Sequence, residues 1–580
     1  MARILLDRFS GYSARHFQKD LTAGVIVGVI AIPLGMAFSI ASGVKPEYGI
    51  YTTIIAGILL AFFGGSRYQI SGPTGAFIPI LFGIVMTYGY QNLLIAGFLA
   101  GVMLFIMGIL RLGSLITFIP RPVTVGFTSG IAVVIFTGQI ANFLGLSGIQ
   151  RHEDFLSNGK EILLHLSTVN LYSVTVALVS LVSILLMPRL SSKLPGALVG
   201  LVLSSLLAAV LFPEKTATIG STFGEISNSL PSLSLPALNW ETISHMLAPA
   251  FVIAMLGGIE SLLSAVVADG MTGTKHNSNR ELIGQGLTNM VVPLFGGIPA
   301  TGAIARTATN IRNGAASPLS SLIHALVVLL VLVLFAPYAS AIPLASMAPI
   351  LMVVAWNMSE RHVFVHILKS RTSDSLVMII TFLLTIFVNL MVAVEVGLLL
   401  AAILFIKRMS DVHAVTKVLP DFSDKHQKVR QHVVTEWRDC PQISLFTVEG
   451  PLFFGAAQLF EKTIMSTVQK KPRVLILRMA KVPYLDITGE YYLRSISHQL
   501  RNHGGLLLIS GLQDQPKRVL KKTGLDQIIG EAQLYVRTGD AISAAISLLD
   551  VDKCRGCKHF AFHECKMLSA LPEKEVAHSN

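Results

Sequence analysis

Long hydrophobic runs separated by short polar segments fill about the first 410 residues of the chain. A run of about 20 apolar residues is long enough to cross a lipid bilayer as a helix. The pattern therefore predicts a multi-pass α-helical membrane protein with fourteen spans. We expect them at residues 21–41, 48–64, 71–88, 91–110, 122–146, 171–188, 194–212, 245–269, 281–298, 301–312, 317–336, 341–357, 375–391 and 392–406.

Two of these runs are interrupted in nearly the same words, "SGPTGAFIPI" (Ser71–Ile80) and "IPATGAIART" (Ile298–Thr307). Backbone that leaves the helix at membrane depth is tolerated only where protein or a water-filled cavity satisfies it. Aligning the two Thr-Gly-Ala words gives an offset of 301 − 74 = 227, which also places Pro33 opposite Glu260. Seven spans in each half would invert the second half across the membrane. The sequence thus predicts 7+7 inverted repeats with discontinuous spans 3 and 10, an arrangement typical of transporters.

The two interrupted spans are candidates for an anion-binding site. We expect each segment to enter as extended chain and to become helical at about Thr74 and at about Thr301. Amide groups at a helix start carry about +0.5 charge and bind anions. The alternative is that both interruptions are kinks that serve only helix packing. The predicted substrate-binding residues are Thr74, Gly75, Ala76, Thr301, Gly302, Ala303, Ala305 and Arg306.

Arg306 and Glu260 are charged residues inside predicted spans, where a charge is costly and usually faces a cavity or a partner. Arg306 would add a full positive charge near the anion; otherwise it pairs structurally or reaches the cytoplasmic surface. Glu260 lies one helical turn before Ser264 on the same face. An acid that gains and loses a proton there would couple proton binding to anion binding, so we predict Glu260 and Ser264 as ion-coupling residues. The alternative for Glu260 is a structural ion pair with Arg306.

The charge distribution agrees with a membrane protein. Charged residues make up only 13% of the chain, against about 25% in average soluble proteins. If the chain starts inside, most Lys and Arg of the membrane part fall on the cytoplasmic side, and Lys45, Arg151, Lys160 and Lys215 fall on the other. This is the positive-inside distribution, so the net charge of +12 indicates topology rather than nucleic-acid binding. An even number of spans places both termini in the cytoplasm.

From about Pro441 the pattern changes to alternating strands and amphipathic helices, which predicts a small cytoplasmic α/β domain. The predicted organisation is an N-terminal segment (1–20), a transmembrane transport domain (21–410), a linker (411–440), the α/β domain (441–550) and a tail (551–580). All four cysteines lie in the cytoplasmic part, where structural disulfides are rare.

The tail contains "CRGCKHFAFHEC", a compact group of metal-binding residue types. Cys-x-x-Cys is a common start of a zinc site, and zinc prefers four ligands. The candidate zinc ligands are Cys554, Cys557, His563 and Cys565. Labile or merely exposed thiols are the alternative.

The word "GPTGA" in the third span and the run from Glu260 to Ser320 resemble the sulfate permease (SulP) family of anion transporters. The resemblance implies a core and a gate domain that move past each other, usually in homodimers, with substrate bound around Thr74 and Ala303 to Arg306. Members with an aspartate at the Glu260 position look sodium-coupled, and the glutamate here resembles the proton-coupled members. Substrates in the family include sulfate, bicarbonate, chloride and dicarboxylates.

The segment "VPYLDITGEYYL" (Val482–Leu493) resembles the STAS domain that these transporters share with anti-sigma-factor antagonists. The resemblance implies a regulatory site at Asp486 and Thr488, where the threonine can be phosphorylated, and a cytoplasmic regulator as a partner. The alternative for Thr488 is a helix N-cap. No catalytic constellation stands out in this domain, so we do not expect an enzyme.

The sequence therefore predicts a secondary active transporter of a small anion (sulfate, bicarbonate or a C4-dicarboxylate) in the plasma membrane. We expect proton-coupled symport, with H⁺ favoured over Na⁺ as the coupling ion and no cofactor required beyond the zinc considered for the tail. The alternatives are an uncoupled anion exchanger or channel, and a membrane sensor that signals through its STAS domain.

Overall fold

The computed structural model describes residues 12–114, 120–152, 154–190, 195–226, 230–233, 239–388, 390–424 and 428–570. Parts of the predicted N-terminal segment (1–11), of two spans (194 and 389), of the linker (425–427) and of the tail (571–580) lie outside these residues. The chain forms two compact units, Met1–Ala401 and Ala402–Asn580, which are described separately.

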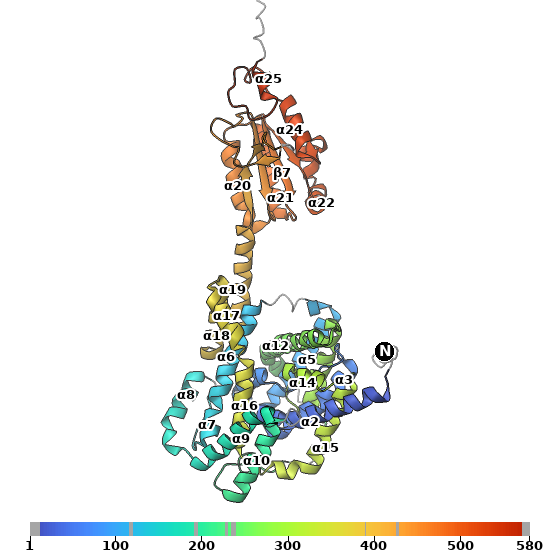
Figure 1. Cartoon of the computed structure of the whole chain (residues 1–580), viewed down its shortest axis with the longest axis vertical. Helices are drawn as coiled ribbons and strands as arrows, with labels where there is room; N and C mark the ends of the chain where they lie inside the picture. The colour runs from blue at the N-terminus through green and yellow to red at the C-terminus, as the bar shows by residue number, and fades with distance from the viewer. Residues whose placement is uncertain are drawn as a thin grey trace, which may run out of the picture. The chain divides into compact units, whose positions relative to one another are not determined.

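The first unit is built from helices (Figure 1). They are α2 (Ala14–Ala41), α3 (Pro46–Phe63), α4 (Ile78–Tyr88), α5 (Tyr90–Ile109), α6 (Arg121–Gly138), α7 (Ile140–Leu144), α8 (Phe155–Leu164), α9 (Leu171–Leu190), α10 (Gly196–Leu211), α11 (Ile219–Phe223), α12 (Trp240–Thr272), α13 (Ser278–Val291), α14 (Ile304–Arg312), α15 (Leu319–Ala339), α16 (Leu344–Met358), α17 (Arg361–Ser370), α18 (Ser373–Phe387) and the start of α19 (Leu390–Asp411). Among the described residues, seven helices are long and apolar enough to cross a membrane, and three shorter apolar helices accompany them.

The helices of the first unit pack in a reciprocal pattern. Helix α5 packs against α12 and α13, while α15 packs against α2 and α3; likewise α6 packs against α18, and α9 against α16. Small residues allow these helices to approach closely, as is usual in membranes. A Cβ atom added at Gly101 of α5 would lie 2.5 Å from the backbone nitrogen of Met290 on α13. The contacts of α5 with α12 and α13 therefore mirror those of α15 with α2 and α3.

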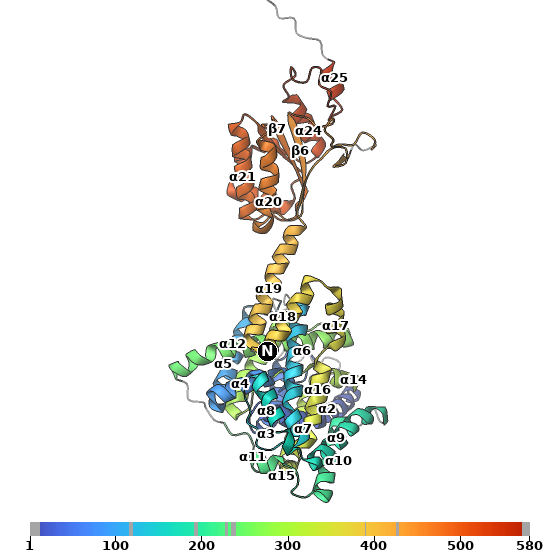
Figure 2. The ribbon, with the colours of Figure 1, turned by 90° about the vertical axis from the view of Figure 1, so that its left-hand side faces the viewer.

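The second unit is a five-stranded sheet covered by helices on both faces. The strand order is β3 (Ala414–Lys417), β6 (Ile443–Glu449), β7 (Val474–Lys481), β8 (Leu506–Ser510) and β9 (Leu534–Tyr535). Strand β3 is antiparallel to β6, and the remaining neighbours are parallel. Helices α20 (Phe454–Val468) and α21 (Ile487–Asn502) lie on one side of the sheet and α24 (Thr538–Ser547) on the other (Figure 2).

The described parts of the predicted linker and tail belong to this second unit. Strand β3, inside the predicted linker, extends the sheet, and a two-stranded sheet of β4 (Leu419–Pro420) and β5 (Val429–Arg430) follows it. In the tail, Ala561 and Phe562 are each only 1% exposed and pack with Ile443 of β6. Hydrophobic side chains at these positions complete the core, so the compact unit is larger than the domain predicted from the sequence.

Candidate functional site

The two interrupted segments meet as a short antiparallel strand pair inside the first unit. Ser71 pairs with Gly302 and Gly72 with Thr301, forming β1 (Ser71–Gly72) and β2 (Thr301–Gly302). The amide of Ala303 adds a hydrogen bond to the carbonyl oxygen of Ile70 at 2.8 Å. The pairing gives the extended backbone of each segment hydrogen-bond partners within the protein.

The strand pair shows how the two words contact each other. Thr301 of the second word lies opposite Gly72 of the first, and Gly302 lies opposite Ser71. The two threonines of the Thr-Gly-Ala words are therefore not paired with each other. The offset of 227 between the two halves, and with it the correspondence of Pro33 to Glu260, stays a prediction.

The start of the helix differs from the prediction in the second segment only. The first segment becomes helical at Gly75, with Thr74 as the N-cap residue, as expected. The second becomes helical only at Ile304, with Ala303 at the N-cap, so the predicted start at Thr301 was wrong. Thr301 is fully buried, and its hydroxyl donates to the carbonyl oxygen of Gly257 at 2.7 Å. Thr301 therefore anchors β2 to α12 in this structure instead of offering its hydroxyl to a ligand.

Buried polar side chains hold the second segment in place. The side-chain amide of Asn289 exchanges two hydrogen bonds, each 2.8 Å long, with the backbone of Ala300. The hydroxyl of Ser264 donates to that of Thr307 at 3.1 Å, and the Thr307 hydroxyl accepts the amide of Ile70. Ser264, predicted to take part in ion coupling, thus links α12 to α14 in a buried position.

Arg306 lies on α14 and is 3% exposed. Its Nη2 donates to the carbonyl oxygen of Pro73, and among the described residues no partner reaches its Nη1. A Cβ atom added at Gly72 would lie 2.7 Å from Nη1, so a side chain at this position would displace the guanidinium from its present place. The positive charge of Arg306 is therefore buried beside the first interrupted segment, and its Nη1 is available to donate a further hydrogen bond.

Glu260 contacts Thr74, the residue that follows Pro73. The hydroxyl of Thr74 donates to Glu260 Oε2 at 2.9 Å. Arg306 and Glu260 therefore contact Pro73 and Thr74, two consecutive residues. The first turn of a helix leaves amides without intrahelical partners, and here it follows directly at Gly75 and Ala76. Ala305, exposed in the first turn of α14, stands next to Arg306.

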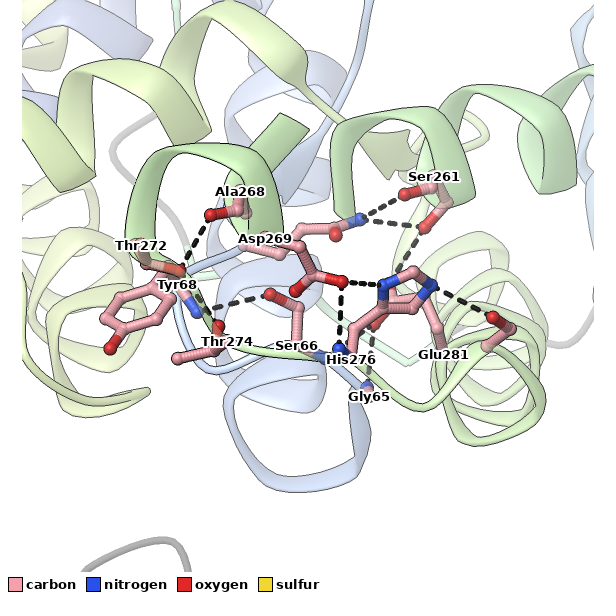
Figure 3. A network of polar contacts seen from close by, with 12 residues as sticks. Gly65, Ser66, Tyr68, Ser261, Ala268, Asp269, Thr272, Thr274, His276 and Glu281 are labelled. Carbon is pink, nitrogen blue, oxygen red and sulfur yellow. Dashed lines mark hydrogen bonds and ion pairs between the residues drawn. The ribbon is translucent and has the colours of Figure 1, made fainter. Parts of the chain in front are cut away.

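A polar network supports the chain before β1 (Figure 3). The carboxylate of Glu281, which is fully buried, accepts the amides of Gly65 at 2.7 Å and Ser66 at 3.2 Å and the hydroxyl of Ser261 at 2.8 Å. Ser261 in turn accepts the side-chain amide of Gln69 at 2.8 Å. At the end of α12, Asp269 binds the ring of His276 at 2.7 Å. The network fixes the approach to Ser71 and requires a carboxylate at position 281.

We expect Glu281→Ala to lower the thermal stability of the protein strongly. The change leaves four buried or half-buried donors without this acceptor, since the side-chain amide of Gln285 also donates to Glu281 at 3.2 Å. Each such group costs about 1–3 kcal/mol. The melting temperature of purified protein in detergent measures the effect. Glu241→Ala, which removes an exposed carboxylate from the start of α12, is the matched control. Equal melting temperatures for the two variants would contradict this role of Glu281.

A cavity between α6, α12 and α19 reaches Glu260 and brings a second acidic residue to it. Its lining is mostly apolar and includes Thr124, Thr128, Glu260 and Glu395. Glu395 was not among the predicted site residues, although it is the only charged residue of the predicted span 392–406 and could have been found by that signal. Two acids on facing helices make this cavity a candidate path to the interrupted segments.

In the second unit, the predicted regulatory pair is adjacent in the structure. Asp486 is the N-cap of α21 and accepts the amides of Gly489 at 2.8 Å and Phe454 at 2.9 Å. Thr488 lies inside the first turn of α21 and is half-buried. The capping role considered for Thr488 therefore belongs to Asp486.

The predicted tail ligands are divided in the structure. Cys554, Cys557 and Cys565 line one small cavity. His563 is exposed, and its ring packs against Phe422 with centroids 5.9 Å apart. Three of the four residues thus come together, and the histidine stays apart.

Comparison with known proteins identifies both units. The model of the sulfate permease family matches residues 17–381, and that of the STAS domain matches residues 436–541. YvdB of Bacillus subtilis (strain 168), which carries the provisional name of a sulfate transporter, is 54% identical over 528 residues, covering 91% of this chain and 98% of its own. The bicarbonate transporter BicA of a Picosynechococcus strain is 31% identical over 547 residues, covering 92% and 95%.

Solved structures show the same architecture. The structure of SLC26A9 matches with a TM-score of 0.86 over 95% of this chain and 93% of its own, at 17% identity, which speaks for the fold alone. The transmembrane domain of a cyanobacterial BicA matches with a TM-score of 0.59 at 33% identity, over 67% of this chain and 98% of its own. Since the family model covers more than half of the chain, the chain belongs to the sulfate permease family and is an integral membrane transporter with a STAS domain, not an enzyme.

Proposed function

We propose that this protein is a proton-coupled symporter of a small anion, and that it binds the anion beside Pro73 and Thr74. One observation carries the proposal: Arg306 and Glu260 contact these two consecutive residues at the start of a helix. The spare Nη1 of Arg306, the amides of the first helical turn and the Thr74 hydroxyl form a set of donors suited to an anion.

The hydrogen bond between Thr74 and Glu260 supplies the coupling. An ionised carboxylate only accepts hydrogen bonds, so it keeps the Thr74 hydroxyl turned toward itself. A protonated carboxyl group can donate, which frees the hydroxyl to donate to the anion. Protonation also removes a negative charge that would repel the ligand. Proton and anion therefore favour each other's binding. The site loaded with both carries less net charge across the membrane than the site loaded with the anion alone.

We propose two inverted halves of seven spans each, with spans 3 and 10 discontinuous at β1 and β2. The reciprocal packing of α5 and α15 and the antiparallel pairing of β1 with β2 support this arrangement. The core would hold the strand pair with α2–α5 and α12–α15, and the gate would hold α6, α9, α10, α16, α18 and α19. The cavity with Glu260 and Glu395 would then lie between core and gate.

For the substrate we propose sulfate first, then bicarbonate, with C4-dicarboxylates as a further group. The 54% identical relative is named for sulfate and the 31% identical one for bicarbonate. We place the protein in the plasma membrane with both termini in the cytoplasm, and we propose a homodimer. Thr488, near the capping Asp486, is the proposed regulatory phosphorylation site. A cytoplasmic partner of the STAS domain would bind it in its phosphorylated form.

Uptake by purified protein in liposomes tests the proposal. We expect radiolabelled sulfate or bicarbonate to accumulate when the outside is more acidic than the inside, and to equilibrate only slowly without the gradient. Uptake that ignores the proton gradient would favour an uncoupled exchanger or channel. Anion binding without flux, measured by calorimetry on the same preparation, would favour a sensor that signals through its STAS domain.

A further inference from the structure

All four cysteines of the chain face one cavity in the second unit. Cys440 stands just before β6, whereas Cys554, Cys557 and Cys565 come from the segment after α24. Cys440 is far from the others in the sequence and carries no motif of its own. The fold therefore adds a fourth thiol to the three that the tail supplies.

Hydrogen-bond donors are directed at three of these sulfur atoms. The amide of Ile443 donates to Cys440 Sγ, the amide of Phe562 to Cys565 Sγ, and the side-chain amide of Gln442 to Cys554 Sγ, each at 3.4 Å. Such N–H groups favour a thiolate over a thiol, and they are typical of the second shell around metal-bound sulfur. The protein therefore directs a specific N–H donor at each of three sulfur atoms that line the cavity.

The four sulfur atoms are available to a common ligand. All four cysteines are free in this structure, and Cys440 is buried while the other three are half-buried. A deprotonated cysteine is a metal ligand, so four thiols around one cavity offer a complete set of sulfur ligands to a single ion.

We propose that Cys440, Cys554, Cys557 and Cys565 bind one zinc ion as a tetrathiolate site. Four thiolates around zinc form a closed structural site, and the Cys554-x-x-Cys557 pair is a common half of one. Lys553, which also lines the cavity, would offset part of the negative charge of the zinc tetrathiolate. Among the described residues, no three potential ligands are already arranged to hold a metal ion, so we expect the tail segment to close slightly around it.

Zinc would fasten the tail to the sheet. The segment already packs Ala561 and Phe562 against Ile443 and Leu508, on the face opposite α20 and α21. Coordination would join this segment to the start of β6, and structural zinc sites contribute directly to folding free energy. The proposed set replaces His563, predicted from the sequence, with Cys440. It does not depend on the transport function proposed above.

The metal content of the full-length protein tests this inference. We expect elemental analysis of protein purified in detergent, without a metal-affinity step, to give one zinc per chain. Cys440→Ser and Cys557→Ser should each lose most of the zinc, whereas His563→Ala and His559→Ala should keep it. The two histidine variants are matched controls because His559 lines the same cavity and His563 does not.

A second measurement on the unmodified protein does not depend on variants that fold. Treatment with a strong chelator should release the zinc and make all four thiols available to a maleimide that labels few of them beforehand. Protein without zinc, zinc retained in Cys440→Ser, a disulfide among the four cysteines by mass spectrometry, or iron with sulfide in place of zinc would each overturn the proposal.

Discussion

Glu260→Gln is expected to abolish the stimulation of anion uptake by an inward proton gradient. A glutamine keeps the size of the side chain but cannot exchange a proton, so the Thr74 hydroxyl no longer has two states to alternate between. Hydrogen bonds to ionised groups contribute about 1.5–3 kcal/mol, which corresponds to about tenfold or more in gradient-driven uptake. Initial rates in proteoliposomes at several outside pH values measure the effect.

Two further variants test whether the effect is specific to the contact between Glu260 and Thr74. Thr74→Val should also weaken the coupling, because it removes the hydroxyl that Glu260 accepts, while leaving the carboxyl group in place. Glu241→Gln, which neutralises an exposed acid on the same helix α12, should leave the pH profile unchanged. Full gradient-driven uptake by Glu260→Gln would remove Glu260 from the coupling mechanism. Glu395→Gln would then show whether the second acid of the cavity carries the proton instead.

Arg306→Ala is expected to weaken anion binding itself rather than its dependence on pH. The guanidinium is buried and has a spare Nη1 beside Gly72. Losing a hydrogen bond between a buried charge and an anion costs about 1.5–3 kcal/mol, so we expect the half-saturating concentration to rise about tenfold to a hundredfold. Arg306→Lys should restore part of the affinity, because it returns the charge without the planar fork. Calorimetric titration with the anion measures binding apart from transport.

Gly72→Ala perturbs the same contact from the other side. The added methyl group would meet Nη1 at 2.7 Å and displace the guanidinium, so affinity should fall although both charges remain. Gly83→Ala on α4 is the matched control, since an added Cβ there meets nothing within 4 Å. Unchanged affinity in both Arg306→Ala and Gly72→Ala would show that the anion binds elsewhere.

The membrane class and the two interrupted segments could be predicted from the sequence because each depends on local composition. Hydrophobic runs of sufficient length demand a lipid environment. Glycine and proline within them mark backbone that another part of the protein must satisfy. Glu260 and Arg306 were recognisable as well, since a charge inside an apolar span is costly wherever it faces. The change of pattern near Pro441 likewise marked the second unit.

The contacts of these residues were decided only by the tertiary structure. Register placed Thr301 opposite Gly72, and the Thr301 hydroxyl is bound to the carbonyl oxygen of Gly257. Cys440 joined the tail cysteines, and Glu395 joined Glu260, across more than a hundred residues in each case. The physical reason is the same throughout. Periodicity and composition report what one segment must bury, whereas the partner it is buried against depends on how distant segments pack, and no local pattern records that.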